Sequence, residues 1–353
     1  KHRCQRNRGK IPSRLAAPRV VLYCSLVPKA ARPKRRLAAQ ALSVRHPQPQ
    51  SMRDIVFLFG AGASAGAGGI LPERPPLGVE LFGELERLFP GSWGALPPDV
   101  AAGLRANFEE GMAALAGRYG MAVPGLMRDM AVYFIQFRPV ARDSLYNRLV
   151  TELAHRGLLE RTAFSTLNYD CVLEFALLQE GAGIDYFGNG AETQVPVWKL
   201  HGSCNMFSAG VRAGPGIQYA QGVVFEGGIE AWLDSSRVIE HCLVETGLAP
   251  VMCQYMQGKP TTVSPAAIRQ LQERWAQAVG TAVVLVCIGV RPYAADEHIW
   301  APLHSASGTL LFVGDDAAFG RWALGRHSPV TRIGSRFVDA LPSLFTHLEA
   351  TCS

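Results

Sequence analysis

Short runs of strand-forming residues alternate along the chain with longer stretches in which apolar residues recur every three or four positions. The short runs are residues 55–59, 162–166, 195–200, 281–288 and 309–313. Continuous runs of this length are typical of strands that are buried on both faces of a parallel sheet, whereas the longer spacing is typical of helices. The alternation therefore predicts an α/β fold, a Rossmann-like doubly wound parallel sheet.

The helical stretches fall into two groups. Those before the second strand are residues 77–89, 100–115, 126–137 and 145–159, and those after it are residues 171–179, 265–279, 296–307 and 335–349. Most of the first group forms a helical insertion of about residues 95–160, which would cover a cofactor cleft or form an oligomer surface. The pattern favours neither role. Residues 205–265 are predicted to be irregular, with a short helical segment near residues 229–244.

Composition sets the class of protein. With 353 residues, 48% of them hydrophobic and 18% charged, the chain can bury a large core, and we expect one domain over residues 52–353. The apolar run 282–288 is too short for a membrane span, which needs about 20 residues. The eight cysteines never fall as Cys-x-x-Cys, which argues against a four-thiolate zinc site and for a reducing, cytoplasmic compartment.

The positive charge is concentrated at the start of the chain. Residues 1–53 hold 14 of the 35 Lys and Arg and none of the 29 Asp and Glu, so the rest carries 21 − 29 = −8 and is not predicted to bind nucleic acid. Residues 1–51 are interpreted as a basic arm, an organellar transit peptide, or sequence outside the natural product. The third interpretation is favoured, because Met52 directly precedes the first strand.

The first strand continues into the turn Gly60-Ala-Gly-Ala-Ser64. Glycines here let backbone amides approach a diphosphate closely, although they could also simply permit a tight turn. A dinucleotide-binding dehydrogenase would also place an acidic residue about 20 positions on, after a second strand. That offset reaches Glu80, which lies in a stretch of helical spacing. A dehydrogenase is therefore disfavoured.

Two further strand ends carry polar residues: Thr166-Leu-Asn-Tyr-Asp170 and His201-Gly-Ser203. In open α/β sheets ligands bind at the carboxyl ends of the strands, so these residues are candidates for a site. Each also has a purely structural explanation. Asn168 could cap the next helix, and Asp170 could add favourable negative charge at the N-terminus of that helix. His201 could be a buried structural histidine.

Taken in order, the motifs Gly60-Ala-Gly-Ala-Ser64, Thr166-Leu-Asn-Tyr-Asp170 and Leu200-His-Gly-Ser203 resemble the NAD-binding core of the sirtuins, most closely the zinc-free sirtuin-like domains of bacterial defence proteins. The resemblance continues in Cys287-Ile-Gly-Val290 and Asp296-Glu-His298, and covers about residues 54–316. It implies an NAD-binding domain that needs no zinc.

The resemblance also implies a role for each matching residue. Catalysis would fall to Asn168, which orients water, and His201, which acts as the base. The diphosphate and ribose contacts would come from Gly60, Ala61, Gly62, Ser64, Thr166, Asp170 and Gly202, and the adenosine contacts from Gly289, Asp315 and Asp316. His298 and His304, on the later helix, are interpreted as surface or interface residues.

Two departures from the family's deacetylases bear on the activity. The four-cysteine zinc module after the His-Gly motif is missing, and residues 72–75, Pro-Glu-Arg-Pro, stand where an Asp-Phe-Arg segment is expected. Both favour an NAD hydrolase that releases nicotinamide and ADP-ribose, as an effector in anti-phage defence. The alternatives are an NAD-dependent deacylase or ADP-ribosyl transferase, and a non-catalytic sensor of NAD or ADP-ribose. Because uncontrolled NAD hydrolysis would harm the cell, we expect control by a homo-oligomer, a defence-system partner or the helical insertion.

Overall fold

The computed structural model describes residues 53–119, 123–188, 194–210, 224–245, 247–253, 261–315 and 317–352. The interpretations of residues 1–51 and of Asp316 concern positions outside these described residues.

A seven-stranded parallel sheet forms the centre of the molecule, with strand order β11-β10-β9-β1-β4-β6-β5. The strands are β1 (Ile55–Phe59), β4 (Thr162–Thr166), β5 (Gly183–Asp185), β6 (Gln194–Lys199), β9 (Val284–Ile288), β10 (Thr309–Val313) and β11 (Val330–Gly334). The chain adds β4 and β6 on one side of β1 and β9, β10 and β11 on the other. The predicted α/β, Rossmann-like fold is confirmed, and β1 lies where the strand order reverses.

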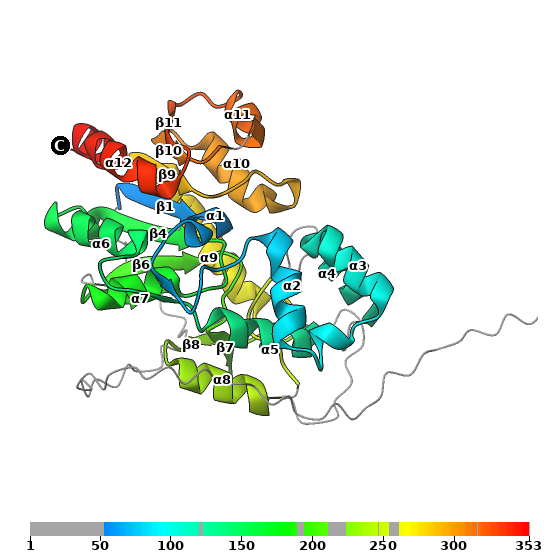
Figure 1. Cartoon of the computed structure of the whole chain (residues 1–353). Helices are drawn as coiled ribbons and strands as arrows, with labels where there is room; N and C mark the ends of the chain where they lie inside the picture. The colour runs from blue at the N-terminus through cyan, green and yellow to red at the C-terminus, as the bar shows by residue number, and fades with distance from the viewer. Residues whose placement is uncertain are drawn as a thin grey trace, which may run out of the picture.

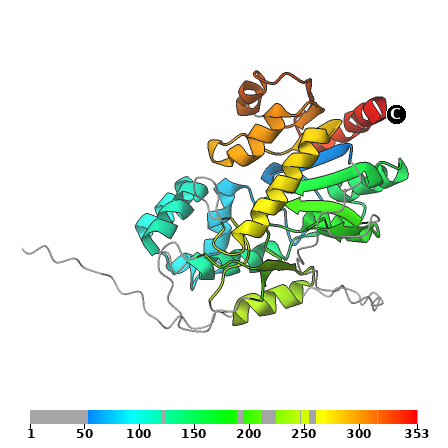
Figure 2. The ribbon, with the colours of Figure 1, turned by 180° about the vertical axis from the view of Figure 1, so that it is seen from behind.

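Helices cover both faces of the sheet. Figure 1 shows α6 (Leu145–His155), α7 (Val172–Gln179) and α12 (Phe337–Cys352) on one face. Figure 2 shows α9 (Pro265–Thr281) crossing the opposite face, beside α10 (Glu297–Ser305). Covered in this way, every residue of β1 is at most 2% exposed. This two-sided burial explains why β1 and β9 are continuous apolar runs without alternation.

The helical insertion stands beyond one end of the sheet in both views (Figures 1 and 2). Of the predicted residues 95–160, α3 (Pro98–Ala106), α4 (Phe108–Tyr119) and α5 (Val123–Phe134) stand there, whereas α6 covers the sheet. They are joined by α2 (Gly78–Leu88) and the 3-10 helix η1 (Trp93–Ala95), which come before the predicted insertion. The predicted helix 100–115 is two helices, because the Asn107 side chain accepts hydrogen bonds from the N–H groups of Glu109 and Glu110 and starts α4 there. A short pair of strands, β2 (Ile70–Leu71) and β3 (Arg138–Pro139), links the two ends of the insertion.

The segment predicted to be irregular contains ordered elements. The antiparallel strands β7 (Met206–Ala209) and β8 (Gly228–Ala231) precede α8 (Ser235–Val244), where the Asp234 carboxylate caps the helix by accepting from the N–H of Ser236 at 2.9 Å. The predicted strand 281–288 begins only at Val284, since α9 extends through Thr281. The remaining short elements are α1 (Ala61–Ala65), α11 (Ala317–Ala323), η2 (Leu159–Arg161) and η3 (Ala294–Asp296).

Among the described residues, no helix is both long and apolar enough to cross a lipid bilayer.

Candidate functional site

A cleft of about 710 Å³ opens where the carboxyl ends of β1, β4, β6 and β9 meet. The register of the sheet brings these ends together, because Phe59 pairs with Thr166 on one side and Ile288 on the other, and Thr166 pairs with Lys199. From the strand ends, the cleft is lined by Gly60, Ala61, Ser64, Leu167, Asn168, Tyr169, Asp170, His201, Gly289, Val290, Arg291, Pro292, Tyr293 and Asp296. Its size is in the range of small-molecule and cofactor sites.

The opposite wall of the cleft comes from residues 75–81 and from the helical insertion. The residues are Pro75, Pro76, Leu77, Gly78, Val79, Leu81, Ala106, Asn107, Phe108, Glu109 and Phe134, and Ala318 of α11 closes one end. Of the two roles that the sequence left open for the insertion, the structure supports that of covering a cleft.

Two glycine loops interlock at the base of the cleft. The N–H of Gly62 donates to the carbonyl of Gly289 at 3.1 Å. A Cβ on Gly60 would lie 2.5 Å from that carbonyl oxygen, and one on Gly289, whose φ is +63°, would lie 2.1 Å from the backbone nitrogen of Ala63. The glycines therefore serve first to pack the two loops together. Gly60, Ala61, Ser64 and Gly289 line the cleft, whereas Gly62 is not among its lining residues.

Asn168 is fixed to the first loop by its amide. Its Nδ2 donates to the carbonyl of Gly60 and to the hydroxyl of Ser64, both at 3.0 Å, and the Ser64 hydroxyl also contacts the hydroxyl of Tyr146 at 3.1 Å. The backbone N–H of Asn168 donates to Thr166 Oγ1. With both Nδ2 hydrogens engaged, the amide oxygen is the group that Asn168 can offer to a ligand. Its side chain is not a helix cap, which was the structural alternative.

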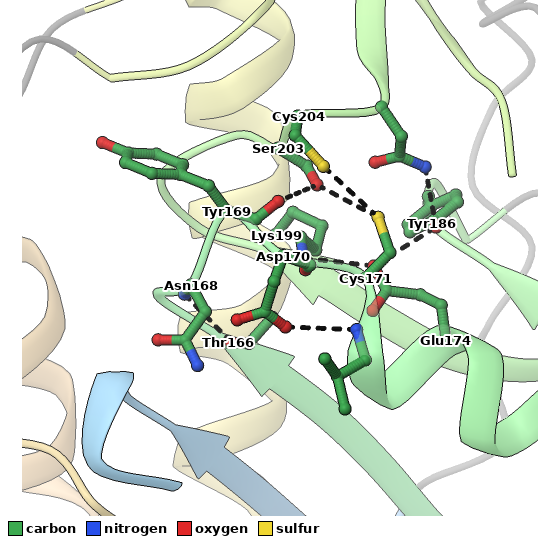
Figure 3. Close-up of polar contacts among 12 residues, drawn as sticks. Thr166, Asn168, Tyr169, Asp170, Cys171, Glu174, Tyr186, Lys199, Ser203 and Cys204 are labelled. Atoms are coloured by element: carbon green, nitrogen blue, oxygen red, sulfur yellow. Dashed lines mark hydrogen bonds and ion pairs between the residues drawn. The ribbon is translucent and has the colours of Figure 1, made fainter. Parts of the chain in front are cut away.

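Asp170 combines a structural contact with a place on the cleft. Its carboxylate accepts from the N–H of Val172 at 3.1 Å, at the start of α7, as the structural interpretation predicted. Its backbone carbonyl accepts from Lys199 Nζ at 2.5 Å, and Lys199 in turn pairs with Glu174 at 3.1 Å (Figure 3). Lys199 and Glu174 have fully buried side chains.

These buried charges shift one another's pKa values. Burial raises the pKa of the Asp170 and Glu174 carboxyl groups, and the nearby ammonium of Lys199 partly offsets the rise. Burial alone would lower the pKa of Lys199, but Glu174 and the other groups around it outweigh that effect and raise it. Lys199 therefore remains a cation beneath the cleft.

The loop after β6 is bound tightly to the loop after β4. Ser203 Oγ donates to the carbonyl of Tyr169 at 3.1 Å, and Cys204 N–H donates to the same oxygen at 3.0 Å (Figure 3). The Sγ atoms of Cys171 and Cys204 lie 3.7 Å apart, both buried, and burial raises the pKa of the Cys171 thiol well above its usual range. A neutral thiol of this kind acts as a small apolar side chain.

His201 meets Asp296 and His298 at the edge of the cleft. His201 Nε2 lies 3.4 Å from Asp296 Oδ1, and both side chains are about 95% buried. The His298 ring lies 5.4 Å from the His201 ring, between their centroids. His298, interpreted as a surface or interface residue, is half-buried and also neighbours His201. His304 instead packs against Trp322, with ring centroids 5.9 Å apart.

Three other predicted residues do not line the cleft. Thr166 is buried, and its hydroxyl oxygen accepts a hydrogen bond from the backbone N–H of Asn168. Gly202 has a φ of +72°, and a Cβ there would lie 2.0 Å from the carbonyl oxygen of Val251, so it allows two backbone segments to pack. Asp315 is exposed and pairs with Arg332 at 2.5 Å.

Several residues of the site were missed from the sequence. Lys199 is the one with a signal, because a lysine inside an apolar strand points to a buried ion pair. Asp296 and His298 were noted only as part of a motif. Nothing in the sequence marks Tyr146 or the wall residues of the insertion as part of a site, because they lie in stretches with ordinary helical spacing.

The fold and the strand-end cleft define an α/β protein of the Rossmann-like class. No model of a known protein family matches the chain. A search of curated proteins likewise found no match. The arguments about function therefore start from the geometry of the cleft.

Proposed function

We propose that the cleft binds NAD and hydrolyses its nicotinamide–ribose bond, releasing nicotinamide and ADP-ribose. The observation that carries the proposal is that Asn168 and His201, from adjacent strands, both line a cleft whose other strand-end loops are the glycine turns at Gly60 and Gly289. A ligand at the switch point of such a sheet commonly places its phosphates on a glycine turn. The motif resemblance to zinc-free sirtuin-like domains supports the same substrate.

The chemistry needs few groups. The C–N bond breaks with its electron pair going to nicotinamide, which leaves as a neutral molecule, so no strong acid is required. Water then adds to the ribose carbon of the oxocarbenium-like species and loses one proton. The Asn168 amide oxygen accepts a hydrogen bond from the water or a ribose hydroxyl, and His201 takes up the proton.

The residues beneath the cleft act by holding these two groups in place. Ser64 and the carbonyl of Gly60 fix the Asn168 amide, and the bonds from Ser203 and Cys204 to the Tyr169 carbonyl hold the loop after β6 against the loop after β4. An orientation fixed before the substrate binds reduces the entropy lost on reaching the transition state.

The test is nicotinamide release from NAD by the purified full chain. We expect release without any acylated peptide, and losses of about 10²- to 10⁴-fold in His201→Ala and Asn168→Ala. His304→Ala is the matched control for the histidine, because His304 is half-buried but does not line the cleft. Thermal unfolding of each variant confirms that the fold is intact.

Each other outcome supports a different function. Release that requires an acylated peptide would indicate a deacylase. NAD binding without release would indicate a sensor. Full activity in both Asn168→Ala and His201→Ala would refute the assignment of these two residues.

A further inference from the structure

Three side chains with metal-binding atoms meet at the edge of the cleft: His201 after β6, Asp296 at the end of η3 and His298 in the first turn of α10. One ligand atom from each lies within 4.8 Å of the other two. His201 and Asp296 are buried and His298 is half-buried, so the cluster is unlike the groups of exposed carboxylates common on protein surfaces.

The distance between the ligand atoms of His201 and Asp296 fits a metal ion. Zinc bonds to nitrogen and oxygen are about 2.0–2.2 Å, so two ligands at a tetrahedral angle of about 109° stand about 3.4 Å apart. His201 Nε2 and Asp296 Oδ1 are 3.4 Å apart. His298 offers the third ligand atom, within 4.8 Å of the other two.

We propose that His201, Asp296 and His298 form a binding site for a divalent transition metal ion such as Zn²⁺. Two imidazoles and one carboxylate suit zinc and its first-row neighbours, whereas Mg²⁺ and Ca²⁺ favour sets made of oxygen ligands. Three protein ligands leave a further coordination position. Since His201 and Asp296 line the cleft, that position is reached from the cleft.

Such a site has a consequence for catalysis, which rests on the proposed function. A metal ion bonded to His201 occupies the nitrogen lone pair that would accept a proton from water. The ion therefore inhibits NAD cleavage reversibly, and a chelator restores it. The metal site itself does not depend on NAD being the substrate.

Metal binding is tested first, without any activity measurement. Co²⁺ is titrated into the full chain while visible absorption is followed, because Co²⁺ in a tetrahedral site with nitrogen ligands gains intense bands. We expect saturation at one ion per chain in competition with a chromophoric chelator, with affinity at least 10-fold weaker in His298→Ala and Asp296→Ala. The matched controls are His304→Ala and Glu297→Ala, an exposed carboxylate beside the cluster. Absence of the bands, or equal affinity in His298→Ala, overturns the site.

Inhibition is tested separately, as the ratio of nicotinamide release with and without Zn²⁺ for each variant, so that changes in basal rate cancel. The expected ratio is low for the wild type and close to one for His298→Ala. A ratio of one for wild-type protein that binds Zn²⁺ overturns the inhibition and leaves the binding site standing. Co²⁺ binding in a protein that never cleaves NAD would refute the proposed function, not the metal site.

Discussion

The two sides of the cleft are built in opposite ways. The floor, formed by the ends of β4 and β6 and the loops after them, holds buried polar groups: Asn168 donates to Gly60 and Ser64, and Lys199 donates to the backbone carbonyl of Asp170. The wall, formed by residues 75–81 and helices α3 and α4, is tied by exposed ion pairs such as Arg105 with Glu86. Buried pairs are costly to break, whereas exposed pairs contribute little. The floor is therefore expected to be rigid, and the wall is the side that can adjust.

The largest effect is expected from Lys199→Met, which leaves the Glu174 carboxyl group buried without its cation. Breaking a buried pair in this way costs about 3–5 kcal/mol, measured as the free energy of unfolding in denaturant. The double variant Lys199→Met with Glu174→Gln should recover much of that loss, since no charge is then left buried. A single variant as stable as the wild type would contradict the proposed difference between floor and wall.

Gly289→Ala should have the next largest effect. A Cβ there would lie 2.1 Å from the backbone of Ala63, at a φ of +63°. The left-handed conformation and the overpacking together cost about 3 kcal/mol, and the two glycine loops must separate. The control is Gly78→Ala at the start of α2, where no atom lies within 4 Å of the added carbon. Equal stability of the two variants would show that the loops do not interlock as described.

On the wall, Arg105→Ala removes a 2.5 Å ion pair with Glu86 and a contact of the guanidinium over the Phe82 ring. Because the pair is exposed, we expect a loss of at most about 1 kcal/mol. Glu86→Gln keeps the side-chain shape and removes only the charge, which separates the two contributions. A loss as large as that of Lys199→Met would mean that the wall is as rigid as the floor.

The smallest effect is expected from Glu80→Gln, and it depends on pH. Hydrogen bonds from Arg74 and from the N–H of Leu77 lower the pKa of Glu80 to about 2. A lowered pKa contributes stability above the unfolded value of about 4.5, and this stability is lost as the pH falls towards 2. The wild type should exceed the variant by roughly 0.5 kcal/mol at pH 6, and the difference should vanish near pH 2.

The floor should respond to acid differently. The raised pKa values of Asp170 and Glu174 mean that the folded chain holds their protons more strongly than the unfolded chain does. Their contribution to stability therefore increases as the pH falls and is lost as the pH rises through the raised pKa values. Acid should loosen the wall before the floor, which hydrogen exchange of α2 and of α7 would reveal as a difference in protection.

The sequence predicted the sheet better than the site. The strands at residues 55–59 and 309–313 have the predicted bounds, because strands buried on both faces leave a continuous apolar run. The short strands β5 and β11 were missed, since a partly buried strand of three to five mixed residues has no clear pattern. Likewise, a helix boundary set by one side chain, Asn107, cannot be read from periodicity.

The site was predicted as far as strand ends determine it. Asn168, Asp170 and His201 line one cleft because parallel strands bring their carboxyl ends together. The ion pair beneath Asp170 and the neighbourhood of His298 depend on contacts between elements far apart in the chain, which no local pattern records. Asp315 was predicted from its position in the resemblance alone; it is exposed and pairs with Arg332, and its predicted contact with adenosine stays a prediction.

The interlocked glycine loops also set the order of assembly during synthesis. Gly60 emerges from the ribosome well before Gly289, whose backbone completes the base of the cleft and which lies more than 200 residues further along the chain. Pairing of β1 with β9 has a long sequence separation and is expected to be slow. A nascent chain that ends before β9 therefore has no finished cleft, so any reaction there begins only after β9 has been synthesised.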